Sequence, residues 1–366
     1  MRIDVFLLSD NNYIGMLKYI KNNLSLLFVF TLLYFITRYF HYLSKKKYFL
    51  LIKIFFIVGT MQTLSYYIPL LNIFNEFIGL FMNRGDSVHN IMVGRGVIFL
   101  CPEPSFAGML FIIMLIINIY YYKVINLITK KEFFKYSMLL IISIILTKSA
   151  TSYLLLLILT LIYLLIYSKR NFIFMIGISI IISYVILQNG ISNRGIKVID
   201  ILINNPTILL HDRSVTARLS DLLVGIGSLT SYPFGHGSGT GNIYYFNENN
   251  FLLFQYISTN FNVSLEHNSV VFQSLLGNLL FTYGFIGLFP VYFIVSIFLF
   301  KPILKKDYIM LKFSMLMIPL ILFMILTSNP ISFPYIWLLF GISLNYFYIQ
   351  RNRGVYNYEK NTNIYR

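Results

Sequence analysis

Charged side chains are scarce in this chain: Asp, Glu, Lys and Arg make up 11% of its 366 residues, whereas a soluble domain has about 25%. That scarcity excludes an ordinary soluble domain. Hydrophobic residues make up 57% of the chain, and several apolar runs approach the roughly 20 residues that cross the hydrocarbon core of a bilayer. The composition therefore predicts an all-α, polytopic integral membrane protein.

Cysteine and metal-binding patterns are also nearly missing. The single Cys101 excludes an internal disulfide and says nothing about the redox compartment. The sequence has no Asp-x-Asp pair and no histidine or cysteine spacing that suits zinc, so we expect neither a metal nor another cofactor. No small-x-small site follows the first apolar run, which argues against a cleaved signal peptide.

The net charge of +16 invites a nucleic-acid interpretation, but the lysines lie in short loops between apolar runs, so we expect no nucleic-acid partner. Basic clusters fall on alternate connections between these runs, which the positive-inside rule assigns to the cytoplasm. The C-terminus is then inside and the N-terminus outside. The nine predicted spans are 24–43, 48–74, 104–122, 134–149, 150–167, 171–189, 268–300, 309–328 and 333–350. The basic clusters are Lys45, Lys46 and Lys47; Lys123, Lys130, Lys131 and Lys135; Lys169 and Arg170; Lys301, Lys305 and Lys306; and Arg351, Arg353 and Lys360.

Two polar regions, 75–103 and 190–267, are then extracytoplasmic. The second is long for a connection, and loops of more than about 12–15 residues are usually functional or disordered. Its apolar residues recur periodically, so we expect it to be folded. We interpret residues 1–366 as a single membrane domain, with 190–267 as a large extracytoplasmic loop between spans six and seven.

The predicted outer face carries arginines and histidines, whereas the inner loops carry mostly lysine. A guanidinium presents a planar fork that suits phosphate oxygens; pairing with nearby aspartates is the alternative. Arg213 and Arg218 lie in a segment that predicts a helix, capped by Asp212 or Ser214 and ending near Ser231. A helix N-terminus beside arginines favours an anion.

Three further outer segments carry polar groups. The glycine-rich stretch 231–241 predicts a turn first and a sugar-contacting loop second. Glu103 stands between two prolines at the start of a span, so its carboxylate is held on extended backbone. In the polar segment 147–152, between spans four and five, Lys148 either reaches toward the membrane surface or contacts a lipid phosphate.

His267 lies where the long outer loop meets the seventh span, and Asn268 follows it. An imidazole titrates near neutral pH, so at a membrane surface it can take up and return a proton as a general base. A histidine that caps the helix or bonds a backbone carbonyl is the alternative.

These segments together resemble the O-antigen polymerase and O-antigen ligase superfamily of bacterial membrane glycosyltransferases, over roughly residues 95–350. Ligases often carry an arginine where this chain has Ala150, which favours the polymerase. The matching features, in the order of the family, are Glu103-Pro-Ser-Phe-Ala-Gly108, Thr147-Lys-Ser149, Arg218 followed by Pro233-Phe-Gly-His-Gly237, and His267-Asn268 ahead of Gly284-Phe-Ile-Gly287.

The resemblance implies a metal-independent, inverting transferase that joins undecaprenyl-diphosphate-linked oligosaccharide repeat units into a surface polysaccharide, an O-antigen or a capsule. It would work on the extracytoplasmic face of the bacterial cytoplasmic (inner) membrane, with membrane lipid and a chain-length regulator protein as further partners. The alternatives are an O-antigen ligase that transfers polymer to a lipid or protein acceptor and, from another class, a lipid-linked oligosaccharide flippase. The implied catalytic residues are His267 and Arg218, and the implied substrate-binding residues are Arg213, Arg95, Glu103, Lys148 and Asn268.

The predicted topology can be tested with cysteines placed at Asn205 and Asn249, in a chain whose own Cys101 is replaced by serine. Both should react with a membrane-impermeant thiol reagent in intact cells or spheroplasts, because every lysine-rich connection falls on the opposite side. Protection of both until the membrane is broken would reverse the orientation.

Overall fold

The computed structural model describes residues 12–40, 43–71, 73, 96–101, 103–167, 213–236, 274–327 and 337–349. Within these ranges 86% of the residues are helical and none forms a strand. The all-α prediction is therefore confirmed for the described part of the chain. The chain divides into two compact units. Unit 1 comprises residues 1–41, 205–306 and 317–366, and unit 2 comprises 42–204 and 307–316.

Three described helices are long and apolar enough to cross a membrane: Lys45–Ser65, Pro104–Val124 and Tyr308–Leu326. The bent pair Leu275–Leu288 and Val291–Leu304 makes a fourth if it forms one span. Shorter apolar helices lie at Leu27–Tyr39, Thr151–Tyr167, Asp221–Thr230 and Trp337–Ile349. The chain thus has the helices of a membrane protein. Nine spans remain a prediction, and the range 171–189 lies outside the described residues.

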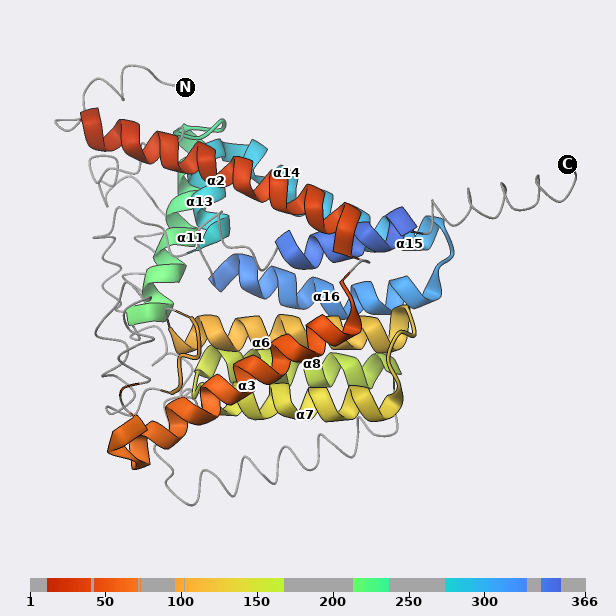
Figure 1. Ribbon diagram of the computed structural model, residues 1–366. Helices are drawn as coiled ribbons and strands as arrows, with labels where there is room; N and C mark the ends of the chain where they lie inside the picture. Colours follow the sequence, from red (N-terminus) through yellow and green to blue (C-terminus); the bar gives the residue numbers. More distant parts are fainter. Residues whose placement is uncertain are drawn as a thin grey trace, which may run out of the picture. The chain divides into compact units, whose positions relative to one another are not determined.

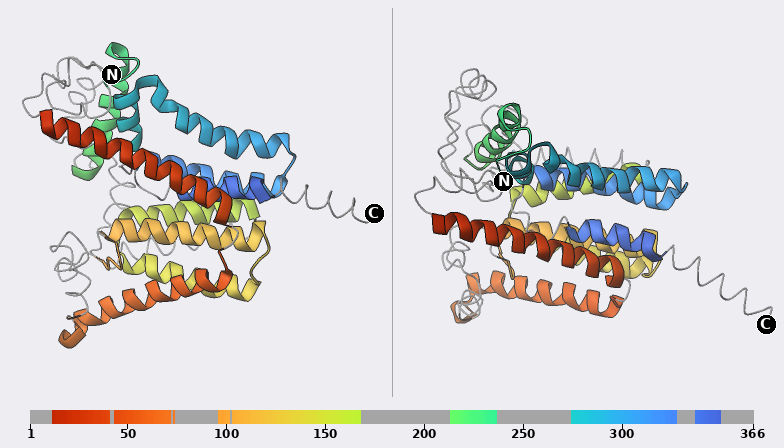
Figure 2. Two further views of the ribbon diagram at one scale, coloured as in Figure 1. Left: turned by 45° about the horizontal axis from the view of Figure 1, so that its top comes forward. Right: turned by 90° about the horizontal axis from the view of Figure 1, so that it is seen from above.

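Four helices of unit 2 pack along their length, with consecutive helices antiparallel. They are α3 (Lys45–Tyr67), α6 (Pro104–Ile119), α7 (Lys130–Leu146) and α8 (Ala150–Tyr167), and two figures show α6, α7 and α8 side by side (Figure 1, Figure 2). A π-helical turn, η3 (Tyr120–Val124), continues α6, and η2 (Pro69–Leu71) follows α3. α6 is the inner helix, because 78% of its apolar window is buried, against 33% for α3.

Local sequence explains where these helices begin. The hydroxyl of Ser44 accepts the backbone N–H of Lys47, which caps α3. Thr129 and Glu132 form a capping box at α7, each side chain accepting the other's backbone N–H. α6 starts on Pro104, whose missing N–H needs no partner in the first turn.

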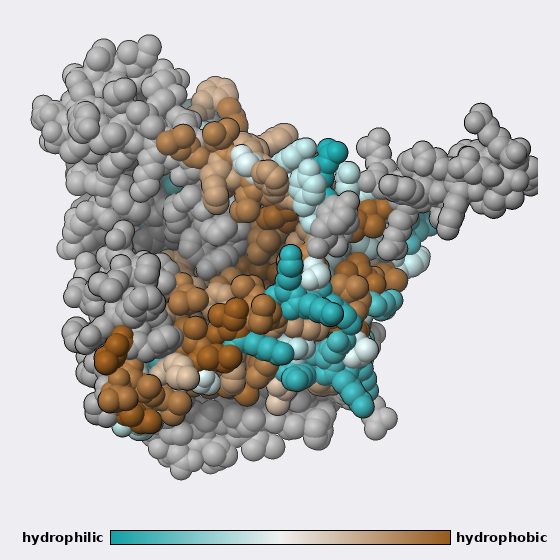
Figure 3. Space-filling view, viewed as in Figure 1, coloured by the Kyte–Doolittle hydropathy of each residue, from teal (hydrophilic) through white to brown (hydrophobic). Residues whose placement is uncertain are grey.

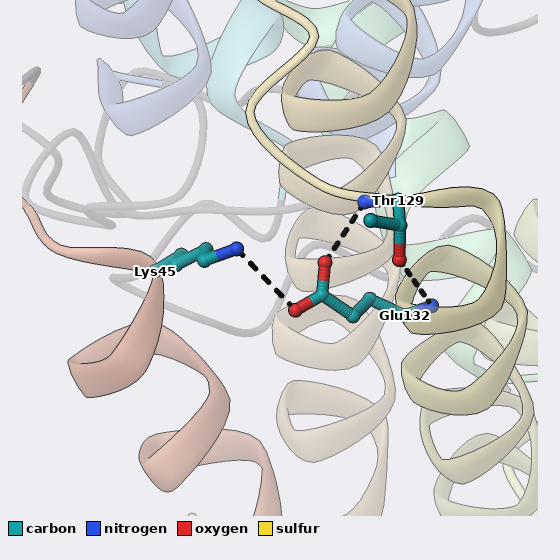
Figure 4. A network of polar contacts seen from close by, with 3 residues as sticks. All are labelled: Lys45, Thr129 and Glu132. Carbon is teal, nitrogen blue, oxygen red and sulfur yellow. Dashed lines mark hydrogen bonds and ion pairs between the residues drawn. The ribbon is translucent and has the colours of Figure 1, made fainter.

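Lysines gather at one end of unit 2, where α3 and α7 begin and α6 ends. Lys45 pairs with Glu132 at 3.4 Å (Figure 4). The Thr129 backbone N–H lowers the pKa of the Glu132 carboxyl; partial burial opposes this shift, and Lys45 adds to it. Glu103 and the 147–152 segment lie at the opposite ends of α6 and α7 from these lysines. The side of the membrane on which each end lies remains a prediction.

Unit 1 contains α2 (Asn12–Tyr39), α11 (Arg213–Ser231) and the helix Trp337–Ile349. The amide of Asn345 donates to the backbone oxygen of Thr37 at 2.7 Å. This bond ties two helices that lie 308 residues apart in the chain. The later part of α16 (Tyr308–Thr327) also belongs to this unit.

The described part of the predicted span 268–300 is a broken helix, and its crossing of the membrane as one span remains a prediction. α13 (Leu275–Tyr283) ends at Gly284, whose φ is 61°, and the segments Leu275–Leu288 and Val291–Leu304 are bent by 55° relative to each other. A left-handed residue cannot continue a right-handed helix. Pro290 then occupies the first turn of the next helix, where it needs no partner for an N–H. The segments after α13 are η7 (Gly284–Leu288), α14 (Phe289–Val295), the π-helical η8 (Ser296–Phe300) and α15 (Lys301–Leu304).

The lowered pKa of Glu132 makes part of the stability depend on pH. A carboxyl with a lowered folded pKa stabilises fully above its unfolded pKa, and this stabilisation is lost as the pH falls through the folded value. We expect the melting temperature of the purified protein in detergent to be slightly higher than that of the Glu132→Gln variant at neutral pH. The difference should close as the pH falls below the ordinary pKa of a glutamate. The effect should be small, about 0–1 kcal/mol, because the pair is partly exposed. A gap of equal size at both pH values would rule out the ionised carboxylate as its source.

Candidate functional site

The segment that leads to Glu103 is held by a buried glutamine of α3. Gln62 is fully buried, and its amide bonds both backbone groups of Phe99: it accepts the N–H at 2.8 Å and donates to the oxygen at 3.2 Å. Phe99 has a φ of 55°, a left-handed conformation that is unusual for a bulky residue and persists only where its surroundings enforce it. Our sequence interpretation missed Gln62, although a lone amide inside an apolar helix is itself a signal.

This segment then lies against the end of α7. The backbone N–H of Val97 donates to the Leu146 oxygen at 2.9 Å. A Cβ on Gly96 would overlap the carbonyl of Thr147 and would lie 2.7 Å from the nitrogen of Lys148. Only glycine allows this approach of two backbones. The residue that follows Arg95 in the sequence is therefore fixed on the 147–152 segment.

The 147–152 segment is a cluster of hydroxyl groups at the turn between α7 and α8. Thr147, Ser149 and Ser152 are buried. The Thr147 hydroxyl accepts the N–H of Ser149 at 3.4 Å, and the hydroxyls of Ser149 and Thr151 lie 2.9 Å apart. Lys148 has a φ of 49° and an exposed side chain. The turn thus keeps its hydroxyls inside and projects its one charge outward.

α6 carries Glu103 to the same cluster. A Cβ on Gly108 would collide with the Ser152 side chain and would lie 3.4 Å from the Thr147 hydroxyl. Glu103 is the N-cap residue of α6 by its backbone, whose oxygen accepts the N–H groups of Phe106 and Ala107. Its half-buried carboxylate makes no capping bond and lies 3.5 Å from the Ser105 hydroxyl. The segments Glu103–Gly108 and 147–152 therefore contact each other at one end of unit 2.

In unit 1, α11 lies against the start of α13. The buried carboxylate of Asp221 accepts the backbone N–H of Ser274 at 3.2 Å, and the Ser274 hydroxyl caps α13 by accepting the N–H of Gly277. A Cβ on Gly225 would lie 2.7 Å from the Gly277 oxygen. Arg218 stands one turn before Asp221 on the same helix. α11 therefore both carries Arg218 and fixes the beginning of α13.

A turn at residues 232–236 docks on the end of α13, which confirms the turn predicted there. The N–H of His236 donates to the Phe281 oxygen, and the N–H of Phe285 donates to the Pro233 oxygen, both at 2.9 Å. Gly235, with a φ of 78°, lies so close to Gly284 that a Cβ on it would be 2.6 Å from the Gly284 nitrogen. The segment 232–236 therefore contacts the beginning of the segment 284–287.

The ring of His236 is part of this packing. It is buried, with its centroid 4.3 Å from that of Phe281 and 4.1 Å from that of Tyr232. The aromatic contacts on two sides assign this histidine a place in the core of the turn. Sugar contact by this turn remains a prediction.

The implied site residues divide into three groups. Glu103 is the N-cap residue of α6, and Lys148 lies in the 147–152 segment that α6 contacts through Gly108. Arg218 is half-buried in α11, with its Nε atom buried. Arg213 begins α11, so Ser214 lies inside the helix, and Asp212 lies outside the described residues. Arg95, His267 and Asn268 also lie outside the described residues. Within the described ranges, no group of three or more His, Cys, Asp or Glu side chains could hold a metal ion.

Comparison with models of known protein families, with curated proteins and with solved structures finds no match for this chain.

The contact between the turn and α13 predicts that Gly235→Ala is destabilising. The substitution combines a left-handed φ with overlap on backbone atoms that cannot swing away, a cost of about 1–3 kcal/mol for the strain alone. Phe234→Ala is the matched control, because that neighbouring side chain is 77% exposed. Thermal unfolding in detergent should show a clear loss for the first variant and little for the second. Equal midpoints for Gly235→Ala and the native chain would contradict the docked turn.

Proposed function

We propose that this protein is a membrane glycosyltransferase that polymerises undecaprenyl-diphosphate-linked oligosaccharide repeat units into a surface polysaccharide, an O-antigen or a capsule. One observation supports the proposal above the others. The described segments that carry the resemblance lie far apart in the sequence, yet they contact one another in pairs at helix ends. Glu103–Gly108 meets 147–152, and 232–236 meets the start of 284–287.

The chemistry requires positive charge where the leaving diphosphate gains negative charge. Arg218 would supply it from α11, and Arg213 would lie one turn away toward the start of that helix. Partial burial of the guanidinium favours this role, because a charge acts more strongly where water is excluded. Asp221 would keep α11 and the beginning of α13 in register while the substrate binds.

The transfer itself is a single displacement. A hydroxyl oxygen of the acceptor sugar attacks the anomeric carbon of the donor, the bond from that carbon to the diphosphate oxygen breaks, and the configuration inverts. His267 would take up the hydroxyl proton as general base. Lys148, exposed at the turn, and Arg95 would contact phosphate; Glu103 and Asn268 would contact sugar hydroxyls.

In this proposal the reaction occurs at the outer face of the cytoplasmic membrane, where the donor keeps its lipid tail in the bilayer. The described helices expose apolar surface, and α6 and α16 carry no charge apart from Lys312 and the terminal turn at Lys123. These features fit a lipid-bound substrate better than a polar path through the bilayer. This is the reason for preferring a polymerase to a flippase.

The proposal predicts that His267→Gln and Arg218→Lys each stop chain growth without removing the protein from the membrane. Glutamine keeps hydrogen-bonding capacity but cannot take up a proton, and a general base contributes about 10²–10⁴ in rate. Lysine keeps the charge but loses the bidentate fork, and loss of one such stabilising donor costs about 10²–10³. Cells should accumulate single lipid-linked repeat units on the outer face, as measured by gel analysis of extracted lipid-linked sugars.

Two matched variants serve as controls. His89→Gln changes another histidine of the predicted outer face, and Arg38→Lys changes an exposed arginine of α2; both should make polymer of normal length. Polymer of normal length and amount from His267→Gln would refute the base assignment. Repeat units trapped on the inner face would point to a flippase, and normal polymer left unattached to its acceptor would point to a ligase.

A further inference from the structure

Two neighbouring helices of unit 2 present exposed apolar residues in stripes. α3 and α7 pack together through the stacked rings of Phe49 and Tyr136, whose centroids lie 3.7 Å apart. Away from this contact each helix exposes large hydrophobic side chains at intervals of three or four residues, which is one helix face. They are 40–57% exposed, and they are Leu50, Ile54, Ile57 and Met61 on α3, and Phe134, Met138, Ile142 and Ile145 on α7.

Exposed lysines lie at one end of both stripes. α3 begins with three lysines and has a fourth two turns later, and α7 has three in its first two turns. The one acid in these turns, Glu132, is paired with Lys45, so six exposed lysines are left without an acidic partner in those turns. Figure 3 shows hydrophobic surface over α3 that gives way to hydrophilic surface at this end. The six are Lys46, Lys47, Lys53, Lys130, Lys131 and Lys135; we call them the basic rim.

We propose that the exposed surfaces of α3 and α7 bind anionic phospholipid, with the acyl chains on the apolar stripes and the phosphate headgroups on the basic rim. The charge selects the headgroup. A zwitterionic lipid brings a positive group of its own to the rim, whereas an anionic lipid neutralises it. The apolar stripes select a lipid over free phosphate, which would leave them uncovered.

The position of the lysines fits this ligand. Lys53 stands two turns inside α3, and a long lysine stem can lie on apolar surface while its charge reaches the headgroup level. Lys135 stands in the second turn of α7, and its Nζ lies 5.9 Å from the centre of the neighbouring Tyr136 ring. The lipid site does not depend on the proposed glycosyltransferase activity, because Glu103 and Lys148 lie at the other end of unit 2 and Arg218 lies in unit 1.

The test compares dioleoyl phosphatidylglycerol with dioleoyl phosphatidylcholine, titrated onto the purified full-length protein in detergent and counted by native mass spectrometry. The native protein should retain the anionic lipid preferentially. The triple variant Lys46→Gln, Lys131→Gln and Lys135→Gln should lose that preference by at least about tenfold, since each basic residue near an anionic surface contributes roughly fivefold. The matched triple variant with arginine at the same positions keeps the charge and should bind as the native chain does.

Salt provides a second readout on the native protein, which holds even if a triple variant does not fold. Binding of the anionic lipid should weaken as the ionic strength rises from about 0.01 M to 1 M, because the Debye length falls from about 30 Å to 3 Å. Retention of both lipids to the same extent by the native protein, or an anionic preference that neither salt nor the glutamine variant reduces, would overturn the proposal.

Discussion

Backbone hydrogen bonds at the ends of apolar helices are the constraint on which the described structure depends. A chain with so little charge has few side chains to satisfy the carbonyl and N–H groups that a helix leaves unpaired at its ends, and hydrocarbon offers no water. The structure meets this need by laying one segment of backbone against another. Val97 bonds Leu146, His236 bonds Phe281, and Phe285 bonds Pro233. These bonds are what bring distant segments of the sequence together.

Glycine and small hydroxyl residues make such contacts possible. Gly108 lies against Ser152, and Gly235 lies against Gly284, at distances that no larger residue permits. These contacts fix the relative positions of short segments that lie far apart in the sequence.

Composition and charge placement predicted the helices of unit 2 and the gathering of lysines at one end. The range predicted for the fourth span, 134–149, missed the first turn of α7, because the capping box of Thr129 and Glu132 starts the helix at Lys130. Hydropathy predicts 268–300 as one span but does not predict that α13 ends at Gly284. The break at Gly284 depends on a left-handed φ that tertiary contact with the 232–236 turn enforces, and no local pattern shows it.

The charged residues of the candidate site could be predicted from the sequence, but the residues that hold their backbone in place could not. Glu103, Lys148 and Arg218 stand out because they are charged residues beside apolar runs. Gln62 acts through two hydrogen bonds to the backbone of a residue 37 positions away, and Asp221 through one to a backbone N–H 53 positions away. A partner of that kind leaves no spacing or periodicity in the sequence. The arrangement of such supports follows from packing, which only the structure supplies.

The Gln62 bond has a mechanical consequence. α3 exposes most of its surface, so its depth and tilt respond to the thickness of the surrounding bilayer. Gln62 of the same helix hydrogen-bonds both the N–H and the oxygen of Phe99, which lies four residues before Glu103. A shift of α3 along the membrane normal would therefore move the backbone that leads into the first turn of α6. The lipid environment would in this way affect the position of the Glu103 carboxylate.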